Sequence, residues 1–530
     1  MASLRLVFLL ATMVHGSGVA QARADHAPDE LTPLAGPVLL AGGGQLGSAV
    51  RSAFVDLAGG GTARILVLAG DAKRAQEIDW AAAGASAASV VVVKRAGDLT
   101  TDAALDALLL ADGIWLVALP EKLFAVPLLR TMLVSALERG AAVGAAGSDA
   151  IALTGAPGKV AVGRLNLVPR VELILGAKDP GNDDTHQKAA TTLPGRIAVA
   201  IPDGAAFCVH RGRRMALVGE GSLGFAVKRA GNVLARESVV EAKHQRDPGD
   251  PLPYDLDLLS WIRTARAAEL PPLPAAKPEK PNLAKGALLV HGGGAVSDAT
   301  WQRFVELAGG IEANIVCIPS ADTMEDDAQP SSFSAAKLEK YGCKSVRILH
   351  AATRERAQVD AKFIAAIDQA KGVWIDGGRT YRFMDRFEGT AAHAALRRVL
   401  ERGGVVAGSS AGAQVLGEFL VRGNPKTNDE LTDPGYLAAL GLLPGVVIDA
   451  HFRDRDRTAE FGALAAKHPQ LLGLGVDADT ALVIQSKVGE VLGKGMVTVF
   501  DRRTNGEAPA EGVLLKGGAR IDLVTGKTID

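Results

Sequence analysis

The two halves of this 530-residue chain resemble each other, and this repeat constrains the fold more than any other feature of the sequence. Five pairs of segments match in the same order: 38–44 with 287–294, 54–60 with 304–310, 112–115 with 371–374, 138–140 with 401–403, and 197–209 with 472–484. Between the halves, five prolines lie within residues 271–281, a composition that favours an extended, semi-rigid linker. We therefore predict a duplicated domain, with a first copy over residues 25–269, a linker over 270–284 and a second copy over 285–530.

Within each half, short apolar runs alternate with segments of helical spacing. Residues 287–290 and 314–318 are apolar and rich in strand-forming residues, and between them Trp301, Phe304 and Val305 repeat at helical intervals. Continuous apolar strands that alternate with helices predict an α/β fold, in which a mainly parallel sheet is flanked by helices. In such folds the functional groups gather at the carboxyl ends of the strands.

Composition narrows the possible partners. The chain has 58 Lys and Arg against 59 Asp and Glu, so it carries no overall field that would attract nucleic acid or an anionic membrane. Its hydrophobic fraction of 48% excludes a disordered chain, and its three cysteines exclude a disulfide scaffold. Cys317 lies inside an apolar strand, and we expect it to be a buried small hydrophobe.

The first 24 residues have the layout of a secretory leader. Arg5 precedes a short apolar run over residues 6–14, and the small residues Ala22 and Ala24 come just before Asp25. The apolar run is too short to span a bilayer. We expect export to the periplasm or beyond, with cleavage near Ala24.

A glycine-rich turn follows the first strand of each half. Residues 42–47 satisfy the dinucleotide pattern G-x-G-x-x-G, but in the second half Ser297 stands where the third glycine should be. Glycines kept at this turn without the full pattern indicate close backbone approach, and we expect no nucleotide cofactor. The second copy of the turn reads His291-Gly292-Gly293-Gly294, which resembles the oxyanion motif of lipases and esterases. An α/β-hydrolase-type esterase that uses this turn and Ser410 is therefore an alternative.

The second half also contains a candidate nucleophile and a candidate base. Residues 408–412 (Gly-Ser-Ser-Ala-Gly) follow an apolar strand and precede a run of helical spacing, which is the arrangement of a nucleophile elbow around Ser410. Further along the chain, His451 follows the apolar run 446–448 and can serve as the base of a Ser–His pair. Arg455 and Arg457 lie close enough in sequence to present cations to a carboxylate.

Four motifs of the second half resemble the cyanophycinase branch of the S51 serine peptidases, a family with the fold of class I glutamine amidotransferases. The motifs are Gly377-Gly378, the 408–412 elbow, Asp449-x-His451-Phe452-x-x-Arg455-x-Arg457 and Gly475-Val476-Asp477-x-Asp479-Thr480-Ala481. The resemblance covers about residues 285–500 and is weaker in the first half. It implies two tandem glutamine amidotransferase-like (flavodoxin-like) domains.

The same resemblance implies roles for particular residues. Ser410 would be the nucleophile and His451 its base, with oxyanion amides supplied by Gly378 and Ala411. The acid of the triad should fall within residues 427–430, where the candidates are Glu430 and Asp429. The implied reaction is acyl transfer to Ser410 and then hydrolysis at a β-linked aspartyl amide. Cyanophycin, which has an aspartate backbone bearing arginines, contains such bonds.

The family pattern is not kept at every substrate-binding position. Those implied by the resemblance are Thr380, Asp449, Arg455 and Arg457. However, Arg379-Thr380 stands where a glutamine is usual, Ala450 replaces a glutamine, and Glu460 replaces an arginine. These departures concern the choice of substrate rather than the nucleophile.

The first half lacks the corresponding machinery. Alignment of 138–140 with 401–403 places Gly147 at the position of Ser410, with Ser148 one residue too late. The segment 174–177 matches the region that contains His451 but has no histidine. We predict that the first copy is inactive and serves as a built-in partner, forming a pseudo-dimer within the chain, or as a docking module.

Together these features predict a secreted serine peptidase that acts on a peptide or polyamide substrate with aspartyl linkages. No metal is implied, since the sequence has no H-E-x-x-H motif and no clustered Cys and His. We expect no cofactor, nucleic acid or membrane partner, and leave homo-oligomer formation open. Outside enzymes, the alternative is a binding protein in which both copies have lost activity.

Overall fold

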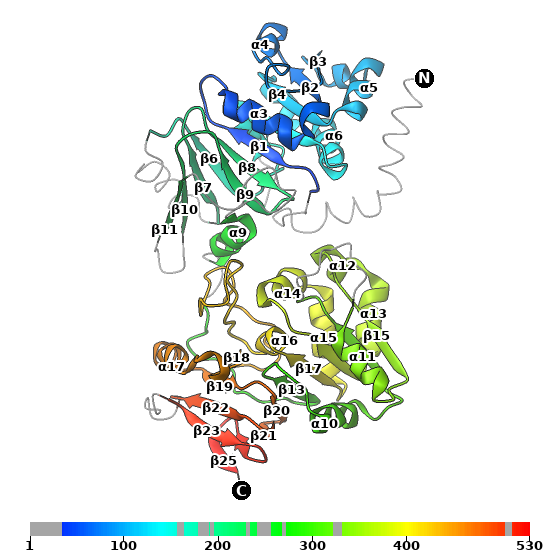
Figure 1. Ribbon diagram of the computed structural model, residues 1–530, viewed down its shortest axis with the longest axis vertical. Coiled ribbons are helices and arrows are strands. Elements are labelled where there is room, and N and C mark those ends of the chain that lie inside the picture. The colour runs from blue at the N-terminus through cyan, green and yellow to red at the C-terminus, as the bar shows by residue number, and fades with distance from the viewer. Residues whose placement is uncertain are drawn as a thin grey trace. The chain divides into compact units, whose positions relative to one another are not determined.

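The computed structural model describes residues 34–155, 164–178, 190, 195–228, 234–240, 256–267, 272–321, 331–503 and 511–529. The predicted leader, residues 1–24, lies outside the described residues. The chain forms two compact units, Met1–Leu270 and Pro271–Asp530, coloured from blue to green and from green to red in Figure 1. Part of the predicted linker packs on the second unit, because Leu283 N–H donates to the carbonyl of Ser486 and Gln470 Nε2 donates to the carbonyl of Ala275.

The first unit contains an eight-stranded sheet in the order β12-β9-β8-β1-β5-β4-β2-β3 and a four-stranded sheet in the order β11-β10-β7-β6. The strands of the larger sheet are β1 (Val38–Ala41), β2 (Arg64–Ala69), β3 (Ala87–Val92), β4 (Gly113–Val117), β5 (Ala142–Ala146), β8 (Ala206–His210), β9 (Arg214–Val218) and β12 (Leu256–Asp257). The smaller sheet consists of β6 (Val171–Leu175), β7 (Ile197–Ile201), β10 (Ser222–Lys228) and β11 (Leu234–Val240). The helices are α3 (Ser48–Leu57), α4 (Ala72–Gln76), α5 (Asp102–Leu110), α6 (Pro127–Glu138), α7 (Gly147–Leu153) and α9 (Leu258–Ala267).

The second unit contains a nine-stranded sheet in the order β15-β14-β16-β17-β13-β20-β21-β24-β25 and a four-stranded sheet in the order β18-β19-β22-β23. The larger sheet consists of β13 (Ala287–His291), β14 (Asn314–Ile318), β15 (Ser345–Ile348), β16 (Gly372–Ile375), β17 (Val405–Ser409), β20 (Thr480–Gln485), β21 (Val488–Gly493), β24 (Arg520–Asp522) and β25 (Lys527–Ile529). The smaller one consists of β18 (Val446–Ala450), β19 (Leu472–Val476), β22 (Met496–Asp501) and β23 (Val513–Lys516). The helices are α10 (Asp298–Ala308), α11 (Phe333–Lys340), α12 (Arg354–Val359), α13 (Ala361–Gln369), α14 (Thr380–Phe387), α15 (Ala391–Glu401), α16 (Ala411–Gln414) and α17 (Thr458–Lys467).

The larger sheets of the two units share one strand order. In the first unit β3, β2, β4, β5 and β1 pair in parallel, and β8 joins β1 antiparallel. In the second unit β15, β14, β16, β17 and β13 pair in the same way, and β20 joins β13 antiparallel. The predicted α/β class with mainly parallel sheets flanked by helices is confirmed. The second, smaller sheet of each unit is a feature that the sequence analysis does not predict.

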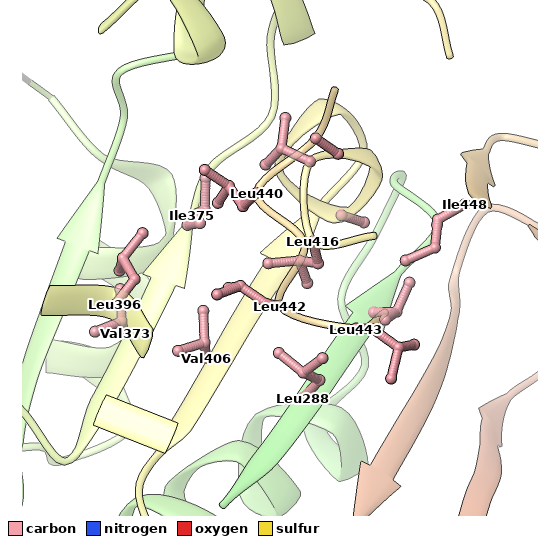
Figure 2. Close-up of a cluster of buried hydrophobic side chains, with 14 of the residues drawn as sticks. Leu288, Val373, Ile375, Leu396, Val406, Leu416, Leu440, Leu442, Leu443 and Ile448 are labelled. Carbon is pink, nitrogen blue, oxygen red and sulfur yellow. The ribbon is translucent and has the colours of Figure 1, made fainter. Parts of the chain in front are cut away.

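The cores match at the positions of the sequence repeat. Phe54 packs edge-on against Trp115 in the first unit, with ring centroids 4.9 Å apart, and Phe304 does the same against Trp374 in the second, at 5.2 Å. Figure 2 shows part of the core of the second unit, where strand residues lie together with leucines of the segments that follow the elbow. The strand residues are Leu288, Val373, Ile375 and Val406, and the leucines are Leu416, Leu440, Leu442 and Leu443. Burial of each such side chain stabilises the fold by about 2 kcal/mol.

Cysteine burial also follows the prediction. Cys317 is fully buried in β14, Cys208 and Cys343 are likewise buried, and none of the three forms a disulfide. Burial raises the pKa of the Cys317 thiol to about 12, which keeps it protonated and inert. Within the described part of the chain, no helix combines the length and the apolar character needed to cross a membrane.

Candidate active site

Ser410 lies on a strained turn between β17 and α16. Its φ is +54° and its ψ is −120°, a backbone conformation that L-residues rarely adopt and that is held here by neighbouring hydrogen bonds. Ser410 N–H donates to the carbonyl of His291 at 2.9 Å, and Gln414 N–H donates back to the carbonyl of Ser410. The flanking glycines are required by packing: a Cβ on Gly408 would lie 2.0 Å from the carbonyl oxygen of Gly412.

The helix after the elbow is shorter than the sequence pattern predicts. The spacing of Val415, Leu416 and Phe419 indicates a longer helix, but α16 ends at Gln414. Gly417 then lies against β18, where an added Cβ would be 2.7 Å from the carbonyl of Val446, and Phe419 forms a parallel bridge with Val447. The chain therefore leaves the helix to join the smaller sheet, and the buried apolar residues that suggested a helix line the core instead.

His451 stands directly after β18 and reaches the serine. Its Nε2 lies 2.9 Å from the Oγ of Ser410, which is hydrogen-bonding distance. His451 N–H donates to the carbonyl of Gly292, and its ring packs on Gly293, where an added Cβ would lie 2.2 Å from Cε1. Burial, followed by the positive charges of Arg455 and Arg457, lowers the pKa of His451 below its ordinary value. The ring is therefore neutral near pH 7 and able to accept the serine proton.

Two backbone amides near Ser410 have the features of an oxyanion hole. Gly377 lies so close to the nucleophile that an added Cβ would be 3.2 Å from Ser410 Cβ, and the next residue, Gly378, has a φ of +141°. Among the described residues, the N–H groups of Gly378 and Ala411 donate to no acceptor. Both amides are therefore available to an oxygen that carries negative charge.

The structure brings neither predicted triad acid into hydrogen-bond contact with His451. Both candidates are exposed: Asp429 accepts a hydrogen bond from Thr427 Oγ1 at 2.9 Å, and Glu430 accepts one from Asn424 Nδ2 at 2.6 Å. Within the described ranges, Ser410 is the only hydrogen-bond partner of the His451 ring. The site is thus a Ser–His pair without a carboxylate bonded to the imidazole.

The carboxylates whose charges do reach His451 are those of Asp454 and Asp479, which raise its pKa slightly against the larger effect of burial. Each is hydrogen-bonded to the backbone, Asp454 to Ala478 N–H and Asp479 to Ala295 N–H. Sequence reasoning missed both as neighbours of the base, although Asp479 lies within the 475–481 motif.

Three predicted substrate-binding residues are buried and bonded within the protein. Asp449 is fully buried, and its carboxylate accepts hydrogen bonds from Gln414 Nε2 and Arg457 Nη1, each at 2.7 Å, and from Arg422. Thr380 Oγ1 donates to the carbonyl of Arg422 at 2.6 Å. In this structure these groups are thus bonded within the protein, and a role of Asp449, Arg457 and Thr380 in substrate binding stays a prediction.

The remaining predicted residue, Arg455, is exposed, and in the described part of the chain its side chain forms no hydrogen bond or ion pair. Glu460, the position of charge reversal, forms an ion pair with Arg422, which also pairs with Asp449. Arg422 and Gln414 are members of this buried network that the sequence motifs do not reveal, since they lie 27 and 35 residues before their partner Asp449.

The glycine turn after β13 does not offer its second amide to a substrate oxygen. Gly293 N–H donates to His291 Nδ1 at 3.2 Å. The esterase interpretation needs the amides of this turn to face the reacting carbonyl, and the Gly293 amide is already used.

The first unit has glycine at the two positions that correspond to Ser410 and His451. β5 ends at Ala146, paired with Ala41, just as β17 ends at Ser409, paired with His291. The next residue is Gly147 with φ +60° in one unit and Ser410 with φ +54° in the other. The smaller sheets match in the same way, so that Gly176 (φ +69°) stands at the position of His451 (φ +49°).

In the described part of the first unit, Ser148 does not take the place of the missing nucleophile. Ser148 is one residue beyond the elbow and has no histidine partner among the described residues. The Asp149 carboxyl, which is 5% exposed, instead faces the N–H groups of Ala118 and Leu119, which lower its pKa against the larger opposite effect of burial. By strand register these amides correspond to those of Gly377 and Gly378.

Comparison with known proteins agrees with the location of this site. The sequence profile of peptidase family S51 matches residues 288–492, which lie in the second unit. A cyanophycinase of Geminocystis herdmanii is 32% identical over 237 residues, covering 42% of this chain and 84% of that protein. A cyanophycinase of Trichormus variabilis is 34% identical over 236 residues, covering 42% of this chain and 75% of that protein.

Among solved structures, a peptidase from an acI-B1 actinobacterium aligns with 45% of this chain and 97% of its own, at 21% identity and a TM-score of 0.34. The likeness to the cyanophycinases extends over most of their length, and it carries the assignment. This chain belongs to peptidase family S51 and is a serine-type hydrolase.

Proposed function

We propose that the second unit hydrolyses β-linked aspartyl amide bonds, as cyanophycinases do, through an acyl-enzyme on Ser410. The observation that carries the proposal is the 2.9 Å contact between Ser410 Oγ and His451 Nε2 on a strained elbow. The relatives named cyanophycinase, 32% and 34% identical, supply the substrate class.

The geometry supports a two-step reaction. His451 Nε2 accepts the proton of Ser410 Oγ as this oxygen attacks the scissile carbonyl, and the negative oxygen is received by the N–H groups of Gly378 and Ala411. His451 then gives the proton to the leaving amine. In the second step His451 accepts a proton from water, whose oxygen attacks the ester, and returns that proton to Ser410.

We propose that the substrate-binding positions implied by the family motifs are only partly used in this chain. Thr380, Asp449 and Arg457 belong to the buried network under the site, and Glu460 completes it by pairing with Arg422. The exposed cation next to the base is Arg455, whose charge is felt by His451. We therefore propose that Arg455 forms an ion pair with a carboxylate of the substrate. The buried network would then set the shape of the protein surface beneath the bound substrate.

The direct test is turnover by the purified full chain. Release of amine is measured with cyanophycin and with β-aspartyl dipeptides, and release of p-nitrophenol with a p-nitrophenyl ester, for wild type, Ser410→Ala and the control Ser148→Ala. We expect amide turnover in wild type and Ser148→Ala and its loss in Ser410→Ala. Turnover of the ester alone would favour the esterase alternative, and no Ser410-dependent turnover of any substrate would favour a binding protein.

We also propose that residues 1–24 direct export and are then removed. The support is the sequence layout, with a short apolar run followed by small residues before Asp25. The amino-terminal sequence of the protein recovered from the periplasm or medium should begin near Asp25. Retention in the cytoplasm with Met1 in place would overturn this proposal.

A further inference from the structure

One histidine next to the catalytic pair has no role in the two-step reaction. His291 is the last residue of the central strand β13 and is fully buried. Its Nδ1 lies 3.0 Å from Ser409 Oγ and accepts the N–H of Gly293 at 3.2 Å. The first unit has Ala41 at this position, so the ring is not needed to form the strand or the glycine turn.

The 291–293 turn joins the nucleophile to the base through its backbone. The carbonyl of His291 accepts the N–H of Ser410 at 2.9 Å, and the carbonyl of Gly292 accepts the N–H of His451 at 2.8 Å. Gly293 forms the surface on which the His451 ring rests. A shift of this turn therefore moves Ser410 and His451 relative to each other.

The hydrogen bonds define the protonation state of His291. Gly293 N–H can only donate, so Nδ1 must be the acceptor, and the single proton of the neutral ring is on Nε2. Among the described residues, Nε2 is buried without a partner. A protonated ring would direct an Nδ1–H at the Gly293 N–H and separate the two groups.

The surroundings of His291, taken together, favour its neutral form. The charged and titratable groups that face it are Asp479, at the start of β20, and His451, after β18, and the group on β17 is the neutral hydroxyl of Ser409. Burial outweighs the attraction of Asp479 and lowers the pKa of His291 to about 4. The ring is neutral throughout the pH range in which the enzyme would work.

We propose that His291 is a positioning residue: its neutral ring, by accepting Gly293 N–H and Ser409 O–H at Nδ1, fixes the turn that sets Ser410 against His451. This inference rests on the proposed function, since it assigns His291 a role in the reaction of that pair. The proposed role of His291 also differs from the role of the histidine in the oxyanion motif of esterases.

Two substitutions of His291 distinguish a positioning role of its ring from a role in packing alone. His291→Leu keeps an apolar side chain of similar size but has no acceptor, whereas His291→Asn places an oxygen near the position of Nδ1. Ser409→Ala removes one hydroxyl and leaves the ring, which gives a milder variant if either change at His291 prevents folding. Kinetics on a β-aspartyl substrate are measured for each variant whose thermal melting shows it to be folded at the assay temperature.

We expect kcat of His291→Leu to fall about 10- to 100-fold with little change in KM, because misplacement of reacting groups by about 1 Å has effects of this size. His291→Asn should recover most of that loss, and Ser409→Ala should lose a smaller part. In wild type the protonation of His291 near pH 4 should add a fall of kcat that is absent in His291→Asn.

Wild-type kcat in folded His291→Leu, or equal kcat in the Leu and Asn variants, would overturn the positioning role. If both His291 variants are unfolded, wild-type kcat in Ser409→Ala overturns it. In each of these outcomes an inactive Ser410→Ala leaves the proposed function standing. If Ser410→Ala is as active as wild type, the proposed function fails first.

Discussion

The two units place the same turns at the ends of the same strands but fill them differently. Ser410 and His451 have φ values of +54° and +49°, and the glycines at their positions, Gly147 and Gly176, have +60° and +69°. Such backbone is strained by about 1–3 kcal/mol for an L-residue and is relaxed for glycine. The shared strand order therefore sets the shape of these turns in both units. Whether a unit can be catalytic depends on which residues stand at the turns.

The amides next to the elbow also differ between the units. In the second unit the N–H of Gly378 has no acceptor among the described residues, whereas in the first unit the carboxyl of Asp149 faces the N–H groups of Ala118 and Leu119. Gly412, at the position of Asp149 in the second unit, has no room for a side chain, since a Cβ there would lie 2.3 Å from the carbonyl of Ile375. In the first unit the Asp149 carboxyl thus occupies the space beside these amides. In the second unit the corresponding space is open to an oxygen of the substrate.

The largest loss of activity is expected when the base, His451, is replaced by the glycine that the first unit has at the same position. His451→Gly removes the proton acceptor and relaxes the backbone, and turnover should fall by about 10,000-fold or more. The protein should remain folded, because Gly176 shows that the same turn forms with glycine. Steady-state kinetics checks the loss, and turnover within tenfold of wild type would break the assignment of His451.

A pair of glycine substitutions tests the surface under the base. In Gly293→Ala the new Cβ would lie 2.2 Å from His451 Cε1, and the φ of +95° is itself strained for alanine, so the turn and the ring must shift and kcat should fall about 100-fold. The corresponding Gly43→Ala lacks that strain and meets only the end of the Asp203 side chain, at 2.9 Å, which can move aside. Activity of Gly43→Ala should equal that of wild type, and equal losses in both variants would contradict the difference between the units.

Asp149 should make the stability of the first unit depend on pH. Burial raises the pKa of Asp149 from 3.8 to about 6 in the folded protein, so folding takes up a proton there. The stability due to this proton is complete below about pH 4 and is lost as the pH rises through 6. Relative to Asp149→Asn, which keeps an uncharged acceptor, wild type should gain about 2 kcal/mol between pH 7 and 4.5.

Hydrogen exchange of peptides from the first unit measures this difference without interference from the second unit. Peptides from the second unit provide the internal control and should show no change between wild type and Asp149→Asn. A pH dependence that is the same in both proteins would contradict a protonated Asp149 in the first unit.

Patterns local in sequence predicted the elbow at Ser410, the position of His451 after a strand, and the glycine at 147, because strand ends and turns are set by neighbouring residues. The partners of Asp449 could not be predicted in this way. They are side chains 27 and 35 residues earlier that meet it only after β18 packs against the elbow. The triad acid is a prediction of the same kind, since a loop such as 427–430 can lie near a histidine in sequence order and still bond elsewhere, as Asp429 and Glu430 do here.

The central claim is that the chain has one reactive serine and that it is Ser410, activated by His451. A fluorophosphonate probe, which forms a covalent adduct with activated serines, tests it with peptide mapping by mass spectrometry. The account predicts a single adduct on the peptide that contains Ser410, absent in His451→Gly and unchanged in Ser148→Ala. An adduct on Ser148, or labelling of Ser410 that persists without His451, would contradict it.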